Sequence, residues 1–286
     1  MSARRDGPIA KAMRWVGRHK GATLIAMLAL LLAGTCGVIM QLVLAQRRVD
    51  AAYERAQKIE AFQLAVSEQG QRFDDALDRF EKQVASLAGH VAELLDDANG
   101  ANGANGGTGG YPADYDGRTR PKYTLAAGAV AGDTRIHWGN PFVDRYGHGL
   151  VLPVSTAVHL PDGSFAGVTG LELTAEWIAK HLLQMPGAPY VVATFLVDER
   201  GRVVIGTEAG GAAAHHSRAG DRDQDRAPEL RDLEYPEVRA ALADGQRSHV
   251  ELVHDDRPQL VAISPLPALG WSYVVIADED RLLAAP

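Results

Sequence analysis

A run of 24 residues without a single charge, ATLIAMLALLLAGTCGVIMQLVLA at positions 22–45, constrains this 286-residue chain more than any other feature. At 1.5 Å per residue, a helix of that length measures about 36 Å, which exceeds the roughly 30 Å hydrocarbon core of a bilayer. A cleaved signal peptide is the alternative, but its apolar core spans only about 7–15 residues. The sequence therefore predicts an uncleaved transmembrane helix over residues 21–46.

Residues 1–20 form a basic tail in front of this helix. One acid, Asp6, stands there against six bases, which are Arg4, Arg5, Lys11, Arg14, Arg18 and Lys20. The positive-inside rule places such a tail in the cytoplasm. No second apolar run of sufficient length follows, so we expect residues 47–286 on the outer side of the membrane.

The composition of the outer part excludes several function classes. The tail takes six of the 29 bases and one of the 36 acids, which leaves the outer part with a net charge of −12, a poor match for nucleic acid. Cys36 is the only cysteine, so the chain forms no internal disulfide and no cysteine zinc site. Asp221, Asp223 and Asp225 alternate as in a calcium loop but lack its glycine and glutamate. We expect no cofactor and no metal.

Residues 47–98 are predicted to form one long helix. From Phe73 onward, apolar residues recur in steps of four and three, a heptad seam made of Phe73, Leu77, Phe80, Val84, Leu87, Val91 and Leu94. Gly70 stands where the preceding seam residue would fall, and we expect it to weaken that turn. Two interpretations remain open: a helix packed on its own domain, or the stalk of a parallel homodimer. Each can hold along a different part.

An Asn/Gly-rich linker at residues 99–110 separates this helix from two units with short strands, residues 111–187 and 188–286. In the first unit, strands at 149–158 and 165–173 flank a Pro-Asp-Gly turn, and Thr174 caps a helix. In the second unit, a helix is expected at 236–243, with strands at 190–197, 202–206, 248–253, 259–264 and 271–277. This order predicts an α+β fold of antiparallel sheets with helices on one face.

Three ordered elements resemble Cache domains, the PAS-like extracellular sensors of bacterial receptors. Gly117–Tyr123 (GRTRPKY) resembles the family's R-P-W-Y element, Trp138–Asp144 (WGNPFVD) its P-Y-x-D element, and Pro153–Glu172 its P-V…D-G-x-F-x-G-V-x-G-x-D hairpin. The resemblance covers residues 111–280 and implies a double Cache, with a distal module at 111–187 and a proximal one at 188–286. The distal module looks truncated, because the linker replaces the family's early strand pair.

The resemblance also implies a site for amino acids. In that family, the first element holds the ligand carboxylate, which assigns Arg120 and Tyr123 to this role. The second element and the hairpin hold the ammonium, which assigns Asp144 and Glu172. The chemistry is charge complementarity between a guanidinium fork and a carboxylate, and between carboxylates and an ammonium.

Two substitutions distinguish this chain from the family pattern at that site. Lys122 stands where the family has tryptophan, and Phe142 where it has tyrosine. A second positive charge beside Arg120 favours a carboxylate-rich ligand over a plain amino acid. The alternative is structural: Arg120 pairs with Asp116 or Asp144 and binds nothing.

Two functions follow as expectations. The first is a single-pass protein of the bacterial inner membrane, with a periplasmic Cache-type sensor that binds an amino acid or carboxylate, forms a homodimer and signals through a separate kinase or other protein. The second is a ligand-free dimerisation module, a relic or fragment of a sensor Ser/Thr kinase, the receptor type that the sequence most resembles. An enzyme is not expected, because the chain has no G-x-S-x-G element and its histidines are scattered.

Overall fold

The computed structural model describes residues 20–100, 116–127, 133–144, 148–208, 211–213, 227–245 and 249–285. The basic tail up to residue 19, the linker from residue 101, and the acidic residues 221–225 lie outside the described residues. The chain divides into two compact units, residues 1–59 and 60–286, which are taken separately below.

The first unit contains the beginning of helix α2, which runs from Lys20 to Gly100. Between residues 24 and 44 its large apolar side chains are exposed, among them Leu24, Leu31 and Ile39. The helix is long and apolar enough to cross a membrane. Apolar side chains that no protein surface covers match the predicted transmembrane helix over residues 21–46.

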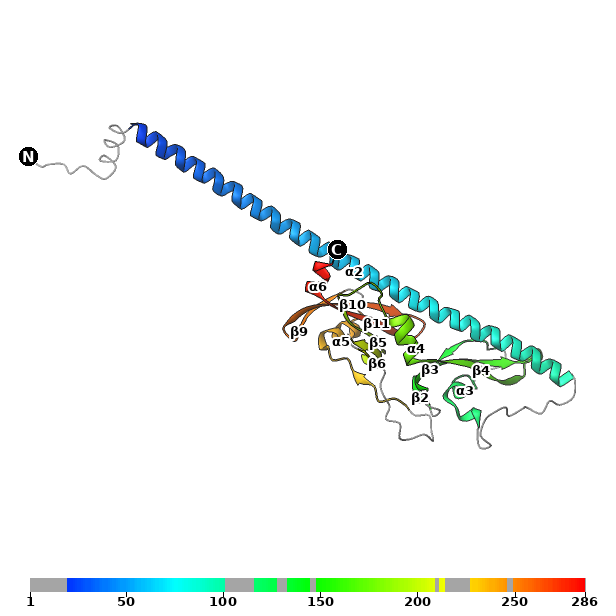
Figure 1. The fold of residues 1–286 in the computed structure, drawn as a ribbon. Helices are drawn as coiled ribbons and strands as arrows, with labels where there is room; N and C mark the ends of the chain where they lie inside the picture. The colour runs from blue at the N-terminus through cyan, green and yellow to red at the C-terminus, as the bar shows by residue number, and fades with distance from the viewer. Residues whose placement is uncertain are drawn as a thin grey trace, which may run out of the picture. The chain divides into compact units, whose positions relative to one another are not determined.

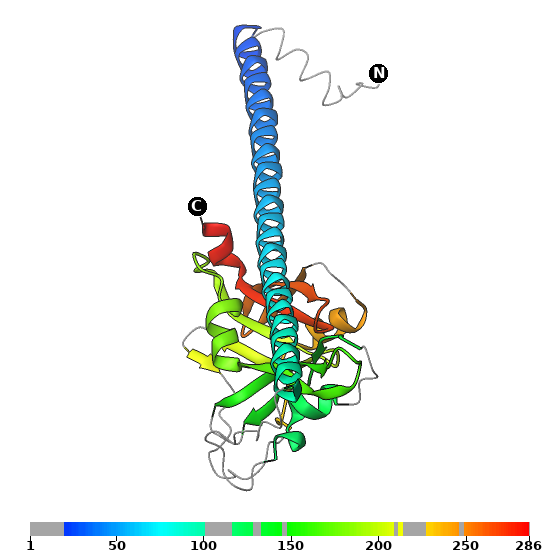
Figure 2. The ribbon, with the colours of Figure 1, turned by 90° about the vertical axis from the view of Figure 1, so that its right-hand side faces the viewer.

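In the second unit, the later part of α2 lies along the strands of its own chain (Figures 1 and 2). Its buried side chains are Phe62, Val66, Phe73, Leu77 and Val84. The ring of Phe62 packs edge-on against Tyr190, and Phe73 packs against Tyr273, at centroid distances of 6.0 and 6.5 Å. These side chains are used within the chain and are not available to a partner helix. Leu87 and Leu94, at the end of the predicted seam, are 39% and 68% exposed.

At Gly70, helix α2 lies very close to the strand that contains Ser264. A Cβ built on Gly70 would lie 2.1 Å from the Oγ and 2.6 Å from the Cβ of Ser264. Asp74, one turn later, accepts a hydrogen bond from the backbone N–H of Ala268. The glycine is therefore a contact point between helix and sheet, whereas the sequence suggested only a weakened turn.

The distal module contains a four-stranded antiparallel sheet. Strand β3 (Gly149–His159) is central: β4 (Phe165–Thr174) pairs along one edge, and the short strands β1 (His137–Trp138) and β2 (Phe142–Asp144) pair along the other. A 3₁₀ turn (Gly117–Thr119) leads into helix α3 (Pro121–Ala126), which packs on β3 and β4. Thr174 caps α4 (Ala175–Ile178) by accepting from the N–H of Trp177, and a π-helical stretch, Ala179–Leu183, continues α4.

The proximal module contains a seven-stranded antiparallel sheet in the order β7-β6-β5-β11-β10-β9, with β8 paired to β6. The strands are β5 (Val191–Val197), β6 (Arg202–Glu208), β7 (Gly211–Ala213), β8 (Arg231–Asp232), β9 (Val250–His254), β10 (Arg257–Leu266) and β11 (Trp271–Asp278). Helix α5 (Pro236–Ala243) covers one face, and α6 (Glu279–Ala284) follows β11.

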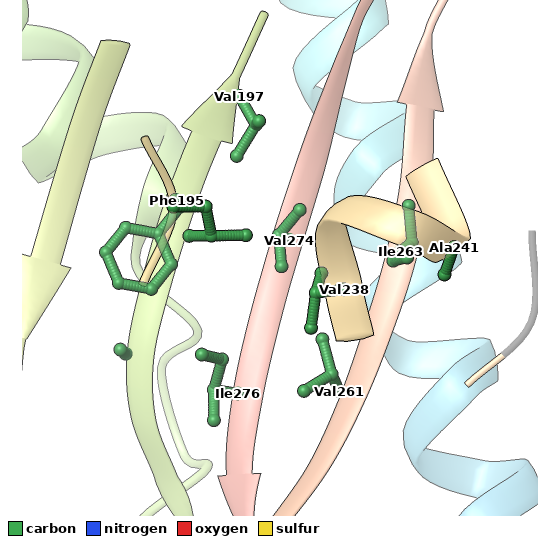
Figure 3. Close-up of a cluster of buried hydrophobic side chains, with 10 residues drawn as sticks. Phe195, Val197, Val238, Ala241, Val261, Ile263, Val274 and Ile276 are labelled. Atoms are coloured by element: carbon green, nitrogen blue, oxygen red, sulfur yellow. The ribbon is translucent and has the colours of Figure 1, made fainter. Parts of the chain in front are cut away.

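An apolar core lies between α5 and this sheet (Figure 3). Val238 and Ala241 of α5 face buried side chains of the central strands, namely Phe195, Val197, Val261, Ile263, Val274 and Ile276. The antiparallel sheets confirm the predicted α+β class. The expectation of helices on one face is wrong, because α2 contacts Ser264 and Tyr273 on the face opposite to α5.

Candidate ligand site

The two faces of the distal sheet are occupied by different helices. The indole Nε1 of Trp138 donates to the Glu81 carboxylate of α2 at 2.7 Å, so Trp138 faces α2. Its cross-strand partner Val154 shares that face, and Pro153 and Glu172, which pair with each other, point to the opposite face. Helix α3 packs on this opposite face, which carries the predicted site.

The start of α3 explains how an arginine enters a buried position. Asp116 caps the preceding 3₁₀ turn by accepting from the N–H of Arg118 at 3.0 Å. Arg120 is extended, with φ −71° and ψ 144°, as expected for a residue before proline. Pro121 begins α3 at a position that lacks a helical N–H partner in any case. This junction holds Arg120 as the N-cap residue of α3, and its side chain is buried.

The Arg120 guanidinium binds two carboxylates that come from different strands. Its Nη2 lies 3.0 Å from Oδ1 of Asp144 on β2 and 3.2 Å from Oε1 of Glu172 on β4. The Nζ of Lys122 lies 3.3 Å from the same Glu172 oxygen. The Phe142 ring stacks under the guanidinium at 5.6 Å, within the range of a cation–π contact. Below, these four charged residues are called the Arg120 network.

Exposure rises steadily along the Arg120 network. The Asp144 side chain is fully buried, Arg120 is 4% exposed, Glu172 18% and Lys122 35%. Burial by itself would raise the pKa of Asp144, but hydrogen bonds from Arg120 and His148 outweigh it and hold that pKa below its ordinary value. The network therefore leads from a buried carboxylate to a solvent-accessible ammonium.

The structure brings together five of the six predicted site residues: Arg120, Lys122, Phe142, Asp144 and Glu172. Tyr123, also a described residue, is half-buried on α3 and makes no hydrogen bond or ring contact with these five side chains. Asp116 pairs with Arg118, at 2.8 Å, and is not the partner of Arg120. The two positive charges of Arg120 and Lys122 balance the two negative charges of Asp144 and Glu172. The network with Lys122 included therefore has no net positive charge. This balance removes the basis for expecting a carboxylate-rich ligand.

His148 belongs to the same cluster, although the sequence did not indicate it. Its Nδ1 lies 2.6 Å from Oδ2 of Asp144, and its backbone N–H donates to that oxygen at 3.3 Å. The only signal was its position four residues after Asp144. Within the described part of the chain, no three side chains of the metal-ligating types come together as a cation site.

The fold is shared with known structures, among them the following two. The ligand-binding domain of the Pseudomonas fluorescens chemoreceptor CtaA, in complex with L-isoleucine, matches with a TM-score of 0.51 and 16% identity over 82% of this chain and 98% of that domain. The extracellular domain of soHK1S-Z6, described as a histidine kinase, matches with a TM-score of 0.52 and 16% identity over 82% and 99%. No protein-family model and no curated protein sequence matches the chain. At these identities the likeness establishes the fold alone, and this α+β fold agrees with the one expected from the resemblance to Cache domains.

Proposed function

We propose that this chain is a membrane-anchored sensor whose distal module binds a free amino acid. The observation that carries the proposal is the buried guanidinium of Arg120, shared between carboxylates of two strands at the N-terminus of α3. Burying such a group is costly, and a hydrophobic replacement often serves stability equally well. A buried charge at the N-terminus of a helix is therefore more readily explained by ligand recognition than by a contribution to stability.

Charge balance favours a zwitterion as the ligand. An amino acid brings one carboxylate for Arg120 and Lys122 and one ammonium for Asp144 and Glu172, so the site stays neutral when it is filled. A dicarboxylate would leave Asp144 and Glu172 facing added negative charge, and a simple amine would leave Arg120 facing added positive charge. The ligand carboxylate enters by replacing Glu172 at Arg120, because Glu172 is the more exposed of the two carboxylates.

The remaining parts of the proposal concern topology and partners. Residues 21–46 span the bacterial inner membrane with the N-terminus in the cytoplasm, and residues 47–286 lie in the periplasm. The sensor passes its signal to a kinase or another signalling protein on a separate chain. It acts as a homodimer, with contacts from parts of α2 other than the buried stretch between Phe62 and Val84.

Calorimetry on the full-length chain in detergent tests the ligand. We expect L-alanine or a larger L-amino acid to bind, and propionate and ethylamine, which each carry one of its charges, not to bind. Glu172→Gln keeps the side-chain shape and removes the charge, and should weaken binding roughly 10-fold to 100-fold, the value of a charge-assisted hydrogen bond. Thr124→Ser on the exposed side of α3 is the control and should bind as wild type. Equal binding of propionate, or no binding by any amino acid, would refute the proposal.

One observation favours the second candidate, a ligand-free interaction module. The Arg120 network is already closed by its own carboxylates, and a closed ion-pair network can serve as a structural joint between α3, β2 and β4. In that case Glu172→Gln changes the melting temperature, no amino acid raises it, and the chain self-associates without a small molecule.

A further inference from the structure

The distal sheet contains a buried hydroxyl that its own structure leaves unused. Ser155, on β3, is completely buried, and its Oγ has no hydrogen-bond partner among the residues that the structure describes. Nearly all buried polar groups in folded proteins are paired, because an unpaired one loses its bonds to water without compensation. An unpaired hydroxyl in a central strand therefore needs an explanation.

Ser155 lies on the same sheet face as the Arg120 network. Strand alternation places it with Pro153, whose cross-strand partner is Glu172. Its own cross-strand partners are His137 on β1 and Gly170 on β4. We call residues that face one another across the strands on this face a row. Two residues along a strand span about 7 Å, so the row of Ser155 lies that far from the row of Glu172, in the direction away from Asp144.

Gly170 keeps the β4 side of this row free of side-chain atoms. A Cβ at Gly170 would lie 2.3 Å from the Val154 carbonyl oxygen and 2.8 Å from the Ser155 Cβ, so the close strand contact admits only glycine. Beside the hydroxyl there is consequently no neighbouring side chain from β4. The row of Ser155 thus combines a buried hydroxyl on β3 with a glycine backbone on β4, and it lies next to the row that contains Glu172.

We propose that Ser155 is a specificity-determining residue that hydrogen-bonds the side chain of the bound amino acid, which selects uncharged polar side chains such as amides. The inference rests on the proposed function, since it assumes that the ammonium of the bound amino acid lies at Glu172 and that the ligand side chain extends from there toward Ser155. A polar atom two or three bonds beyond the ligand's α-carbon then reaches the row of Ser155. An apolar side chain of the same size offers the hydroxyl no hydrogen-bond partner.

Calorimetry with two ligands of nearly equal shape, L-asparagine and L-leucine, tests this inference on the full-length chain in detergent. Wild type should prefer asparagine. Ser155→Ala should weaken asparagine about 10-fold, the loss of one hydrogen bond, and leave leucine unchanged or tighter. The unliganded Ser155→Ala protein should melt at the same or a higher temperature, because the lost hydroxyl had no partner.

Thr156→Val provides the matched control. Thr156 is the next residue, points to the other face, and donates its hydroxyl to the Arg135 carbonyl at 2.9 Å. Its loss should lower the melting temperature and leave the ratio of the two affinities unchanged. Equal loss for both ligands, or a lower melting temperature with Ser155→Ala, would show a structural hydroxyl and overturn the inference alone. If neither ligand binds wild type and no other amino acid does, the proposed function fails with it.

Discussion

The two sheets of this protein both contact helix α2, but they differ in what they bury on the other face. In the proximal module, α5 covers an apolar core that includes Phe195, Val274 and Ile276 (Figure 3). In the distal module, α3 covers Arg120, which binds Asp144 and Glu172. Burying apolar surface stabilises a fold directly, whereas a buried ion pair roughly breaks even against its desolvation. The proximal sheet therefore gains stability from this face, whereas the distal sheet gains little from its ion pairs, as the proposed role in recognition would require.

The largest effect should come from breaking the distal charges. Arg120→Met leaves Asp144 and Glu172 without their shared cation and should lower the free energy of unfolding by about 3–5 kcal/mol. In the proximal core, Ile276→Val should cost only about 0.5–1.5 kcal/mol. Urea unfolding of the full-length chain in detergent measures both. Adding Asp144→Asn and Glu172→Gln to Arg120→Met should recover much of the loss. Equal losses for the two single variants would contradict the contrast between the modules.

The next effect tests the face of helix α2 that packs on the two sheets. Leu77→Ala empties a fully buried position on α2 and should cost about 2–5 kcal/mol. Leu87→Ala, ten residues later on the same predicted seam, removes a side chain that is 39% exposed and should cost less than about 1 kcal/mol. The same unfolding measurement compares them. A Leu77→Ala variant that dissociates a dimer at unchanged stability would instead assign this residue to an intermolecular seam.

A smaller effect is expected where α2 crosses β10. Gly70→Ala places a methyl group against Ser264 and should cost about 1–3 kcal/mol, as overpacking does. Gly89→Ala on the same helix meets no atom within 4 Å and should instead gain up to about 1 kcal/mol, the usual helix propensity difference. Combining Gly70→Ala with Ser264→Gly should restore stability. A gain from Gly70→Ala alone would show that helix and strand are not in contact there.

The smallest effects concern pH, and the two modules should respond at opposite ends of the scale. The pKa of Asp144 is lowered by Arg120 and His148, so its contribution is complete above its unfolded value of about 3.9 and is lost as the pH falls through the folded value. Burial raises the pKa of Tyr273, so its contribution is present below about pH 10 and is lost as the pH rises further. Melting curves should be less acid-sensitive in Asp144→Asn and less alkali-sensitive in Tyr273→Phe. Unchanged slopes would contradict these assignments.

Much of the fold was predictable because its long elements carry periodic patterns. The hairpin of β3 and β4 follows from two apolar runs around Pro161-Asp162-Gly163, and Thr174 was recognised as a helix cap. Strands β1 and β2 have two and three residues, too few for any period to register. Their existence depends on pairing with β3, which is a tertiary property.

The candidate site was predictable in its residue types but not in its connections. The resemblance assigned Asp144 and Glu172 to the ligand ammonium, yet whether Arg120 pairs with Asp144 or with Asp116 depends on how β2, β4 and α3 meet in space. Gly70 was misjudged for the same reason. A glycine within a helical seam indicates a weak turn when read alone, and only the crossing strand shows why no side chain fits there.

The contact between Gly70 and Ser264 restricts how α2 can move as a mechanical element. An axial slide by one turn, about 5.4 Å, would bring Val66 or Asp74 to the place of Gly70, and neither has room beside Ser264. A piston stroke of the helix past the proximal sheet is therefore blocked in both directions. Motion that starts in the distal module must carry helix and proximal sheet together, or pivot about this crossing as a lever does about its fulcrum.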